Sequence, residues 1–451
     1  MQGVIQMEKM SGNTAQTFTA LKTLSPAALP DHPITVRGMV HALRKLGGIT
    51  FLTLRGPERV LQCVFAQEID LQCVTEECVT EECAVSVTGI LRAEPRAPGG
   101  LELAGTDLTV LSRPAAPLPV PVSKWKLDLN LDTELALRPV VLRNLRQRSV
   151  FRVQEALARA FRDTLFSEGF TEIHTPKIVH AGAEGGSNIF RLDYFGRKAF
   201  LAQSPQFYKQ MMVGVFERVF EVAPVFRAEK HSTARHLNEY TSMDFEMGFL
   251  DSFYDIMEME TRFLQNAWKL LQKEYSADLT RLCIELPDVS SIPVLRFDEA
   301  KQLAAKAYCR PIRDPYDLEP EEEQNIGRYA KETFGSDFVF VTHYPSKKRP
   351  FYAMDDPENP KYTLSFDLLF RGMEVTTGGQ RIHDYREQVD KMLARGMHPK
   401  EFESYLMIHK AGMPPHGGLG IGLERLTAQL CGLDNVRHAC LFPRDLCRLE
   451  P

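Results

Sequence analysis

A short proline-rich segment divides this chain of 451 residues into two parts with different sequence patterns. The segment PAAPLPVPVSKW, residues 114–125, contains Pro114, Pro117, Pro119 and Pro121. Proline fixes φ and donates no backbone hydrogen bond, so such a segment interrupts helices and sheets, and proline-rich linkers are stiff and extended. We therefore expect a linker over residues 113–135, and the chain is long enough for about two or three domains.

Short runs of β-branched and alternating residues precede the linker. Residues 33–112 contain the runs ITVRGMVHAL, ITFLTLR, RVLQCVF, AVSVTGILRA and LELAGTDLTVL, which are separated by Gly, Pro or charged residues. This pattern predicts about five strands. A small barrel of the OB-fold type fits best, and such barrels commonly bind nucleic acid, although a purely structural barrel fits the pattern equally well. Residues 1–32 are expected to be an N-terminal extension.

The second part of the chain, residues 136–451, mixes helical and strand patterns. Apolar residues recur at helical spacing over 142–168, at Val150, Val153, Leu157, Phe161 and Leu165. The segments FTEIHTP, KAFLAQS, VFEVAPVFRAEK, YTSMDFEMGF and SFDLLFRGMEVTTGGQRI are predicted strands. Together they predict an antiparallel sheet with surrounding helices, of the α+β class. Residues 276–345 alternate less clearly and are expected to form an insertion.

The overall composition excludes some classes of function. The chain is 44% hydrophobic and 25% charged, as globular proteins are. Its net charge of −5 argues against a generic nucleic-acid binder, so any such contact must come from local patches or shape. An apolar run of about 18 residues is missing, which predicts that no segment crosses a membrane. The N-terminus has no signal-like apolar region, so we expect a cytoplasmic protein.

A crowded charged hairpin follows an apolar strand. The run ERVFEVAPVF leads directly into FRAEKHSTARHLNE, residues 226–239. Arg227 ends the strand, Glu229 follows on the same face, and Arg235 and His236 lie across the turn. An arginine fork suits phosphate, so the hairpin predicts an anion site. A surface salt-bridge cluster is the competing interpretation.

Three further segments carry candidate site residues. GGLGIGLER, residues 417–425, is glycine-rich and ends in Arg425; glycines allow a ligand to approach the backbone, although a tight packing turn would look similar. Asp367 and Glu374 flank a turn, as carboxylates that hold Mg²⁺ do, or they belong to a solvated hairpin. In LAQSPQFYKQ, Lys209 is a candidate partner for a carboxylate, or simply an exposed lysine. Their convergence suggests nucleotide chemistry on an anionic small molecule.

The set and its order resemble the class II aminoacyl-tRNA synthetases of subclass IIb, in particular the aspartyl-tRNA synthetases of archaeal and eukaryotic-like type. FRAEKHSTARHLNEYTSMDFEM resembles motif 2, GIGLERL resembles motif 3, and the helix before FTEIHTPKI resembles motif 1, which builds the homodimer interface in that family. QSPQFYKQ, GGQRIH and the terminal LFPRDLCRLEP are similar to segments of the aspartate enzymes. The resemblance covers residues 33–451.

The resemblance implies roles for individual residues. Arg227 and Arg425 would be the catalytic cations. The ATP site would consist of Arg227, Glu229, Arg235, His236, Tyr240, Glu374, Gly422 and Arg425. The aspartate site would consist of Glu184, Gln206, Lys209, Asp244 and Arg381. Mg²⁺ would bind Asp367 and Glu374. In-line attack on phosphorus needs positioning and charge neutralisation more than a general base, so a catalytic triad is not expected.

The implied substrate is aspartate rather than asparagine or lysine. Lys209 and Arg381, aimed at one side chain, demand an anion; asparagine would leave a desolvated charge unpaired at roughly 1–3 kcal/mol or more, and lysine would be repelled. An archaeal-type asparagine synthetase that makes the same adenylate would lack the N-terminal barrel. A synthetase-like binding protein without catalysis would usually have lost Arg227 or Arg425.

The barrel resembles the anticodon-binding module of the family. Phe51 and Gln62 match a stacking aromatic and its hydrogen-bonding partner for the central uridine that the Asp and Asn anticodons share. Met39 stands where many relatives specific for tRNA-Asp carry Trp. This difference indicates a non-discriminating enzyme that also charges tRNA-Asn for later amidation by an amidotransferase; a neutral packing change in a strictly discriminating enzyme is the alternative.

Overall fold

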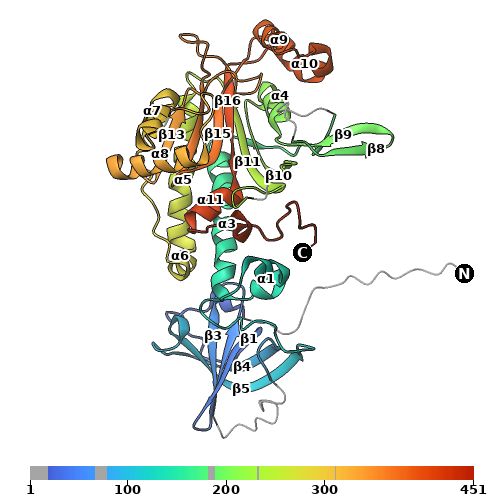
Figure 1. The fold of residues 1–451 in the computed structure, drawn as a ribbon. Coiled ribbons are helices and arrows are strands. Elements are labelled where there is room, and N and C mark those ends of the chain that lie inside the picture. The colour runs from blue at the N-terminus through green and yellow to red at the C-terminus, as the bar shows by residue number, and fades with distance from the viewer. Residues whose placement is uncertain (1–18, 67–78, 181–187, 231–232, 310, 451) are drawn as a thin grey trace, which may run out of the picture. The chain divides into compact units, whose positions relative to one another are not determined.

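The computed structural model describes residues 19–66, 79–180, 188–230, 233–309 and 311–450 (Figure 1). The chain divides into two compact units, Met1–Asp128 and Leu129–Pro451. None of the helices in these ranges is long and apolar enough to cross a membrane.

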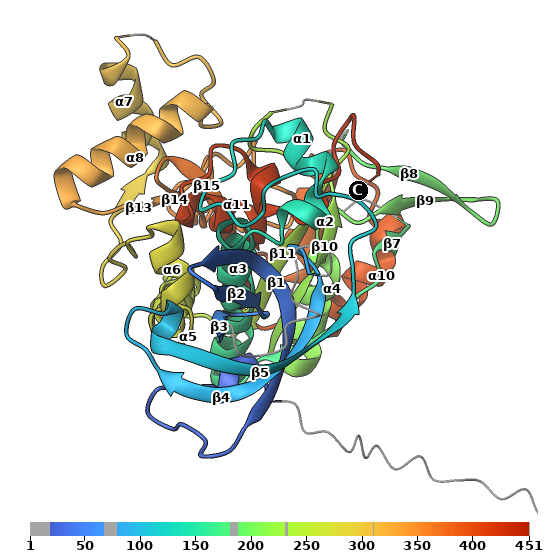
Figure 2. The same cartoon turned by 90° about the horizontal axis from the view of Figure 1, so that it is seen from below.

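The first unit is a closed five-stranded barrel. Its strands are β1 (Ile34–Leu46), β2 (Ile49–Arg55), β3 (Val60–Phe65), β4 (Ala84–Ala93) and β5 (Leu101–Ser112), in the order β1-β2-β3-β5-β4. Figure 2 shows these strands curling around one another. Burial alternates along them: in β3, Leu61, Cys63 and Phe65 are buried, whereas Val60, Gln62 and Val64 are partly exposed. The period-two runs of the sequence therefore become barrel strands because one face of each fills the core, and the predicted barrel is confirmed.

The barrel closes around a dense apolar core. Val36, Val40, Leu52, Leu54 and Phe65 are almost completely shielded from solvent. Gly105 lies on β5 against the ring of Phe65, where a Cβ would collide with the ring. A glycine is therefore required there by close approach rather than by backbone conformation. Two short 3₁₀ helices, η1 (Leu21–Thr23) and η2 (Pro98–Gly100), accompany the barrel.

The second unit is organised around an eight-stranded sheet in the order β12-β13-β14-β15-β16-β11-β10-β6. The strands are β6 (Thr171–Glu172), β10 (Arg218–Phe226), β11 (Glu239–Gly248), β12 (Val294–Arg296), β13 (Phe338–Thr342), β14 (Ser365–Phe370), β15 (Met373–Arg381) and β16 (His416–Gly422). Only the end pairs β10–β6 and β12–β13 run parallel among these strands. The predicted α+β class, with an antiparallel sheet and surrounding helices, is confirmed.

Two long helices cover one face of this sheet and supply its core. They are α3 (Leu145–Ser167) and α5 (Tyr254–Glu274), and Phe161 of α3 packs edge-on against Phe220 and Phe263. Asn144 caps α3 by accepting hydrogen bonds from two backbone N–H groups of its first turn. The apolar positions at helical spacing in the sequence thus form the face that α3 buries.

The remaining elements surround the sheet (Figure 1). The helices are α1 (Leu131–Ala136), α2 (Arg138–Val141), α4 (Gln206–Phe216), α6 (Ser276–Leu282), α7 (Phe297–Ala307), α8 (Pro320–Phe334), α9 (Tyr385–Ala394), η3 (Pro399–Phe402), α10 (Glu403–Ala411), α11 (Leu423–Leu430) and η4 (Val436–Ala439). A small sheet contains β7 (Ile178–Val179), β9 (Arg197–Leu201) and β8 (Arg191–Tyr194), in that order.

The range 276–345, expected as an insertion, is not separate from the main sheet over its whole length. Strand β13 pairs antiparallel with β14, and β12 pairs parallel with β13, so both belong to the central sheet. Helices α7 and α8 lie at this end of the sheet in both views (Figures 1 and 2). The expected linker, 113–135, likewise runs into α1. Strand β12 has only three residues, and a strand so short carries almost no sequence pattern.

Candidate active site

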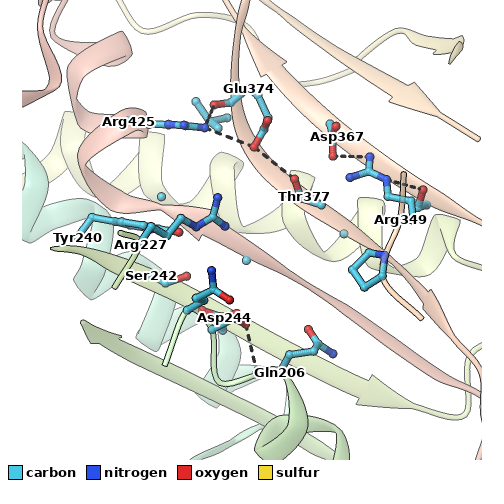
Figure 3. Close-up of a pocket in the computed structure, with 18 of the residues that line it drawn as sticks. Gln206, Arg227, Tyr240, Ser242, Asp244, Arg349, Asp367, Glu374, Thr377 and Arg425 are labelled. Atoms are coloured by element: carbon cyan, nitrogen blue, oxygen red, sulfur yellow. Dashed lines mark hydrogen bonds and ion pairs between the residues drawn. The ribbon is translucent and has the colours of Figure 1, made fainter. Parts of the chain in front are cut away.

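A cavity of about 790 Å³ opens on the central sheet of the second unit (Figure 3). Strands β10, β11, β14, β15 and β16 and the loops at their ends line it. Twelve residues singled out in the sequence are on its wall: Gln206, Arg227, Glu229, Arg235, His236, Tyr240, Asp244, Asp367, Glu374, Arg381, Gly422 and Arg425. Sheet order explains this assembly, because it places the hairpin β10–β11 beside β16 and β15, which come much later in the sequence.

One end of the cavity is built by the charged hairpin after β10. The hairpin is held by the Arg227 backbone N–H, which donates to Asn238 O at 2.9 Å, and by the Asn238 amide, which donates to Arg227 O at 2.7 Å. The Arg227 guanidinium lies 5.7 Å from the centre of the Tyr240 ring. An aromatic surface and a cation therefore stand next to each other, which suits a base and its phosphates.

Arg425 faces this hairpin from the first turns of α11 (Figure 3). Its Nη1 donates to the carbonyl oxygen of Glu374 at 3.2 Å and to Glu374 Oε1 at 3.4 Å, and its Nε donates to Arg235 O at 3.3 Å. Burial raises the pKa of the Glu374 carboxyl, but Arg425 and Arg227 outweigh it and hold this pKa below its usual range. Glu374 is therefore a carboxylate at neutral pH.

His236 and Glu229 form a second pair in the same hairpin. The His236 Nε2 lies 3.4 Å from Glu229 Oε2. Burial lowers the pKa of His236; Glu229 opposes this effect, while the surrounding arginines reinforce it. The net lowering of the pKa favours neutral imidazole, so His236 offers a hydrogen bond rather than a full charge at neutral pH.

Asp367 lies deeper and is matched by an arginine that sequence reasoning did not single out. Arg349 Nη2 donates to Asp367 Oδ1 at 2.7 Å, and its guanidinium lies 3.9 Å from the centre of the Tyr344 ring. Burial raises the pKa of Asp367 to about 6, although Arg349 lowers it. The run SKKRPF, residues 346–351, could have indicated Arg349, because it places basic residues just after the range 276–345.

Asp367 and Glu374 are the carboxylates in this cavity that would serve as ligands of Mg²⁺. The Thr377 hydroxyl donates to Glu374 Oε1 at 3.3 Å. After burial, the negative charge of Glu374 also raises the pKa of Asp367, so the two carboxyl groups interact. Oxygen ligands of this kind fit Mg²⁺, which keeps several waters and shares phosphate oxygens instead of requiring a protein cage. No group of three or more His, Cys, Asp or Glu side chains suited to a metal occurs among the described residues.

The floor of the cavity contains a buried network of charges. Arg381 Nε donates to Glu246 Oε1 at 2.9 Å, and its Nη2 donates to Gln206 Oε1 at 3.3 Å and to Gly418 O at 2.9 Å. Burial raises the pKa of Glu246, but Arg381 and Lys209 outweigh it, and the net pKa is lowered. Glu246 is therefore ionised and orients Arg381 at the cavity wall.

Lys209 lies beneath the wall rather than on it. Its Nζ donates to Asp244 Oδ1 at 3.0 Å and to Leu419 O at 2.8 Å, and it lies 3.3 Å from Glu246 Oε2. The residue is only 1% exposed. Sequence reasoning placed Lys209 and Arg381 together against one ligand group but missed Glu246, although the alternation in MDFEM puts Asp244 and Glu246 on one face of a strand.

The sequence-predicted residues of the barrel lie on its outer face. Phe51 on β2 and Gln62 on β3 are partly exposed. They lie on the same face of the barrel, because Gln62 pairs with Thr53, which is two residues after Phe51 on β2. Arg44 lies 5.3 Å from the centre of the Phe51 ring, and Gln62 Nε2 donates to Glu102 Oε2 at 2.8 Å. Met39 pairs with Arg55 across β1 and β2.

One sequence-predicted residue, Glu184, lies outside the described residues. Arg235 is on the cavity wall and forms an ion pair with Glu323 of α8. Glu323, which does not line the cavity, was not singled out in the sequence, and neither were the lining residues Ser242, Thr377 and Lys348. Single Ser, Thr, Glu and Lys residues in mixed surroundings carry no pattern that distinguishes them, so only the tertiary arrangement finds them.

Models of two known families match the two parts of the chain. The model of the tRNA synthetases class II (D, K and N) matches residues 130–446, and that of the OB-fold nucleic acid binding domain matches residues 34–111. The chain is 48% identical to the aspartate–tRNA(Asp/Asn) ligase of Deinococcus radiodurans, over 96% of this chain and 99% of that protein. It is 47% identical to the ligase of the same name from Thermus thermophilus, over 93% and 96% of the two chains.

Relatives with another printed specificity and solved structures are similar as well. The aspartate–tRNA(Asp) ligase of Pyrococcus horikoshii is 38% identical over 93% of this chain and 96% of that protein. Asparaginyl-tRNA synthetase from the same organism, complexed with asparaginyl-adenylate, has a TM-score of 0.87 at 29% identity and covers 96% of this chain and 100% of its own. From the family match over its second unit and from its relatives at 48% and 47% identity, the chain belongs to the class II tRNA synthetases of the D, K and N group.

Proposed function

We propose that this chain activates L-aspartate with ATP and transfers it to the 3′ end of tRNA-Asp and tRNA-Asn. In the first step a carboxylate oxygen of aspartate attacks the α-phosphorus of ATP, and pyrophosphate leaves. In the second step the terminal ribose hydroxyl of tRNA attacks the adenylate carbonyl, and AMP leaves. The observation that carries the proposal is one cavity that has Arg227 and Arg425 at one end and Arg381 in its floor.

The hairpin end of the cavity suits the nucleotide. Arg227 would neutralise the α-phosphate and align the attacking carboxylate, and Arg425 would meet the outer phosphates; catalysis by charge neutralisation needs no protein nucleophile. Tyr240 would stack on the adenine, since its ring already lies beside Arg227. Glu229, Arg235, His236 and Gly422 complete the wall that would hold ATP.

Mg²⁺ would be held by Asp367 and Glu374 together with phosphate oxygens. When bound, the ion would neutralise charge on the phosphates and on the leaving pyrophosphate. Glu374 stays ionised because of its neighbouring arginines, so its oxygens are available as hard ligands at neutral pH. Asp367 already forms an ion pair with Arg349, so only part of its negative charge would be available to Mg²⁺.

The floor suits a small amino acid with an anionic side chain. Arg381 would pair with the side-chain carboxylate, held in place by Glu246. Gln206 and Asp244 face the cavity and would bind the ammonium group, together with Glu184. Lys209 would act from beneath by balancing Asp244 and Glu246. Asparagine would offer Arg381 no negative charge from the ligand, at a cost of roughly 1–3 kcal/mol or more.

The barrel would read the anticodon through Phe51 and Gln62. A half-exposed aromatic ring can stack on a base for about 1–3 kcal/mol. Met39, near this face, would leave room for either anticodon, which favours charging of both tRNAs. Two relatives at 48% and 47% identity are named for both tRNAs, whereas the Pyrococcus horikoshii relative is named for tRNA-Asp alone, so a discriminating enzyme is the second candidate.

The same proposal covers the cellular setting. The enzyme would be a cytoplasmic homodimer. Motif 1, which consists of helix α3 and strand β6, would form the dimer interface. If it makes aspartyl-tRNA-Asn, a tRNA-dependent amidotransferase must convert the product before it is used.

The test is aspartate charging onto two purified transcripts, tRNA-Asp and tRNA-Asn, with ATP and Mg²⁺. Charging of both supports the proposal as stated. Charging of tRNA-Asp alone would make the enzyme discriminating and remove the argument from Met39. Charging of neither, together with no aspartate-dependent exchange of pyrophosphate into ATP, would overturn the proposed activity and favour a binding protein.

A further inference from the structure

A glutamate of α8 stands directly behind the nucleotide end of the cavity. Glu323 is 7% exposed and does not itself line the cavity. Its carboxylate accepts a hydrogen bond from Arg235 Nη2, and its Oε2 also accepts one from the backbone N–H of Glu374 at 3.3 Å. Glu323 therefore joins the charged hairpin to β15, the strand that carries Glu374.

The helix that carries Glu323 is seated by a close backbone contact. A Cβ on Gly327 of α8 would collide with the backbone nitrogen of Gly372, which lies in the turn between β14 and β15. Gly372 has φ of 74°, and a Cβ there would lie 2.6 Å from Gln324 Cα. Glycine is thus needed on both sides of the contact, and the helix backbone lies against the turn that separates Asp367 from Glu374.

Glu323, Arg235, Arg425 and Glu374 are joined by hydrogen bonds into a closed ring at the nucleotide end of the cavity. Arg425 donates through Nε to Arg235 O and through Nη1 to Glu374 O. Arg235, Glu374 and Arg425 all line the cavity, whereas Glu323 links two of them from outside. A ring of this kind lets one residue outside the cavity fix the position of a cation inside it.

The Arg235 guanidinium retains one donor that is not satisfied within the described part of the chain. Its Nε is buried and has no hydrogen-bond partner among the described residues. A buried donor on an arginine normally finds an acceptor, and a phosphate oxygen at the cavity wall would supply one with matching charge. The Glu323 carboxylate holds the other side of the same guanidinium.

We propose that Glu323 is a positioning residue for nucleotide binding, which holds Arg235 toward the outer phosphates of ATP. The inference rests on the proposed function, because it assumes that ATP occupies this end of the cavity. Glu323 acts through Arg235 and touches neither substrate. Helix α8, from the range expected as an insertion, thereby becomes a support of the site rather than an independent appendage.

The neighbouring glutamate is a matched control. Glu322 is 2% exposed and lies on the same helix, but its Oε2 accepts from Lys301 Nζ at 2.6 Å and from the backbone N–H of Glu319 at 2.9 Å. These contacts remain between α7 and α8 and involve no residue of the cavity. A change at Glu322 therefore disturbs the support of α8 without touching Arg235.

The experiment measures aspartate-dependent pyrophosphate exchange with the full-length protein. For Glu323→Ala we expect the KM for ATP to rise about tenfold, since a charge-assisted hydrogen bond is lost, while the KM for aspartate stays within about twofold. Glu323→Gln, which keeps the shape and an acceptor oxygen, is expected to recover part of the loss. Glu322→Ala is expected to lower the melting temperature and leave the KM for ATP within about twofold.

A double-mutant cycle separates positioning from general support. If Glu323 acts through Arg235, then Arg235→Ala combined with Glu323→Gln should raise the KM for ATP no more than Arg235→Ala alone. Additive effects, an equal rise of both KM values, or an unchanged KM for ATP in Glu323→Ala would each overturn the inference. A wild-type enzyme without exchange activity would instead overturn the proposed function, so the two failures are distinguishable.

Discussion

The two ends of the cavity are built in different ways. The floor residues Lys209 and Glu246 lie on a regular helix and strand, at 1% and 0% exposure, and every charge there meets an opposite charge. At the nucleotide end, Arg235 and His236 come from a hairpin, and the His236 side chain is 34% exposed. The floor is thus preorganised by the fold, whereas the nucleotide end depends on a loop and its supports.

This difference has an energetic consequence. A buried ion pair contributes little net stability, but removal of one partner leaves an unpaired buried charge, which is costly. When a half-exposed cation loses its partner, water solvates the cation, so the loss of stability is small. We therefore expect changes in the floor to reduce stability and activity together, and changes at the nucleotide end to reduce activity alone. The predictions below test that separation.

The largest effect is expected at Glu246. In Glu246→Ala, Lys209 keeps Asp244 but Arg381 loses its buried carboxylate partner. The free energy of unfolding should fall by about 3–5 kcal/mol, the usual cost of breaking a buried pair. Urea denaturation followed by circular dichroism measures it. A variant as stable as the wild type would show that water reaches the floor and that the two ends do not differ as stated.

The corresponding change at the nucleotide end is Arg227→Ala. Loss of a cation that neutralises developing charge should lower the rate of pyrophosphate exchange by about 10²–10³-fold. The midpoint of urea denaturation should stay close to that of the wild type, because Arg227 is only half-buried. A loss of stability comparable to that of Glu246→Ala would contradict the comparison.

A position outside the cavity provides a further contrast. Phe51→Ala removes the exposed ring of the barrel and should weaken tRNA binding by about 1–3 kcal/mol. Pyrophosphate exchange, which needs no tRNA, should be unchanged. Charging kinetics with tRNA-Asp and exchange kinetics without tRNA measure the two effects. Reduced exchange in this variant would mean that the barrel influences the first step as well.

The last prediction concerns Glu260, a carboxyl that is buried in the core rather than at either end of the cavity. Glu260 of α5 accepts a hydrogen bond from the Thr376 hydroxyl, and burial raises the pKa of Glu260 to about 8. Between pH 4.5 and 8 the folded protein keeps a proton that the unfolded chain loses, so stability falls as pH rises, by at most about 1.4 kcal/mol per pH unit.

Glu260→Gln removes this contribution because an amide does not titrate. The difference in unfolding free energy between variant and wild type should therefore grow in favour of the variant from pH 5 to pH 8. Urea denaturation at several pH values checks it. A difference that does not change with pH would show that Glu260 is ionised in the folded protein, as the paired carboxylates of the cavity floor are.

Several parts of the molecule could be predicted from local patterns. The barrel strands follow from period-two alternation, and α3 follows from apolar residues at helical spacing. Arg227, Tyr240, Glu374 and Arg425 could be singled out because each stands in a recognisable segment. Met39 and Phe51 could be placed on strands for the same reason. What these residues contact was not predictable, since a pattern identifies an element and a face but not the neighbour.

The chain's sequence by itself determined the proline boundary, the barrel pattern and the motif segments, because each depends on a few consecutive residues. Only the tertiary structure decided which charges meet. Arg235 and Glu323 are 88 positions apart, and Arg381 and Glu246 are 135 positions apart, yet both pairs form. The order β15-β16-β11 brings Arg381 and Glu246 together, whereas the contact of α8 with the turn between β14 and β15 brings Glu323 to the cavity. A buried charge needs an opposite charge in space, and sequence distance carries no information about that requirement.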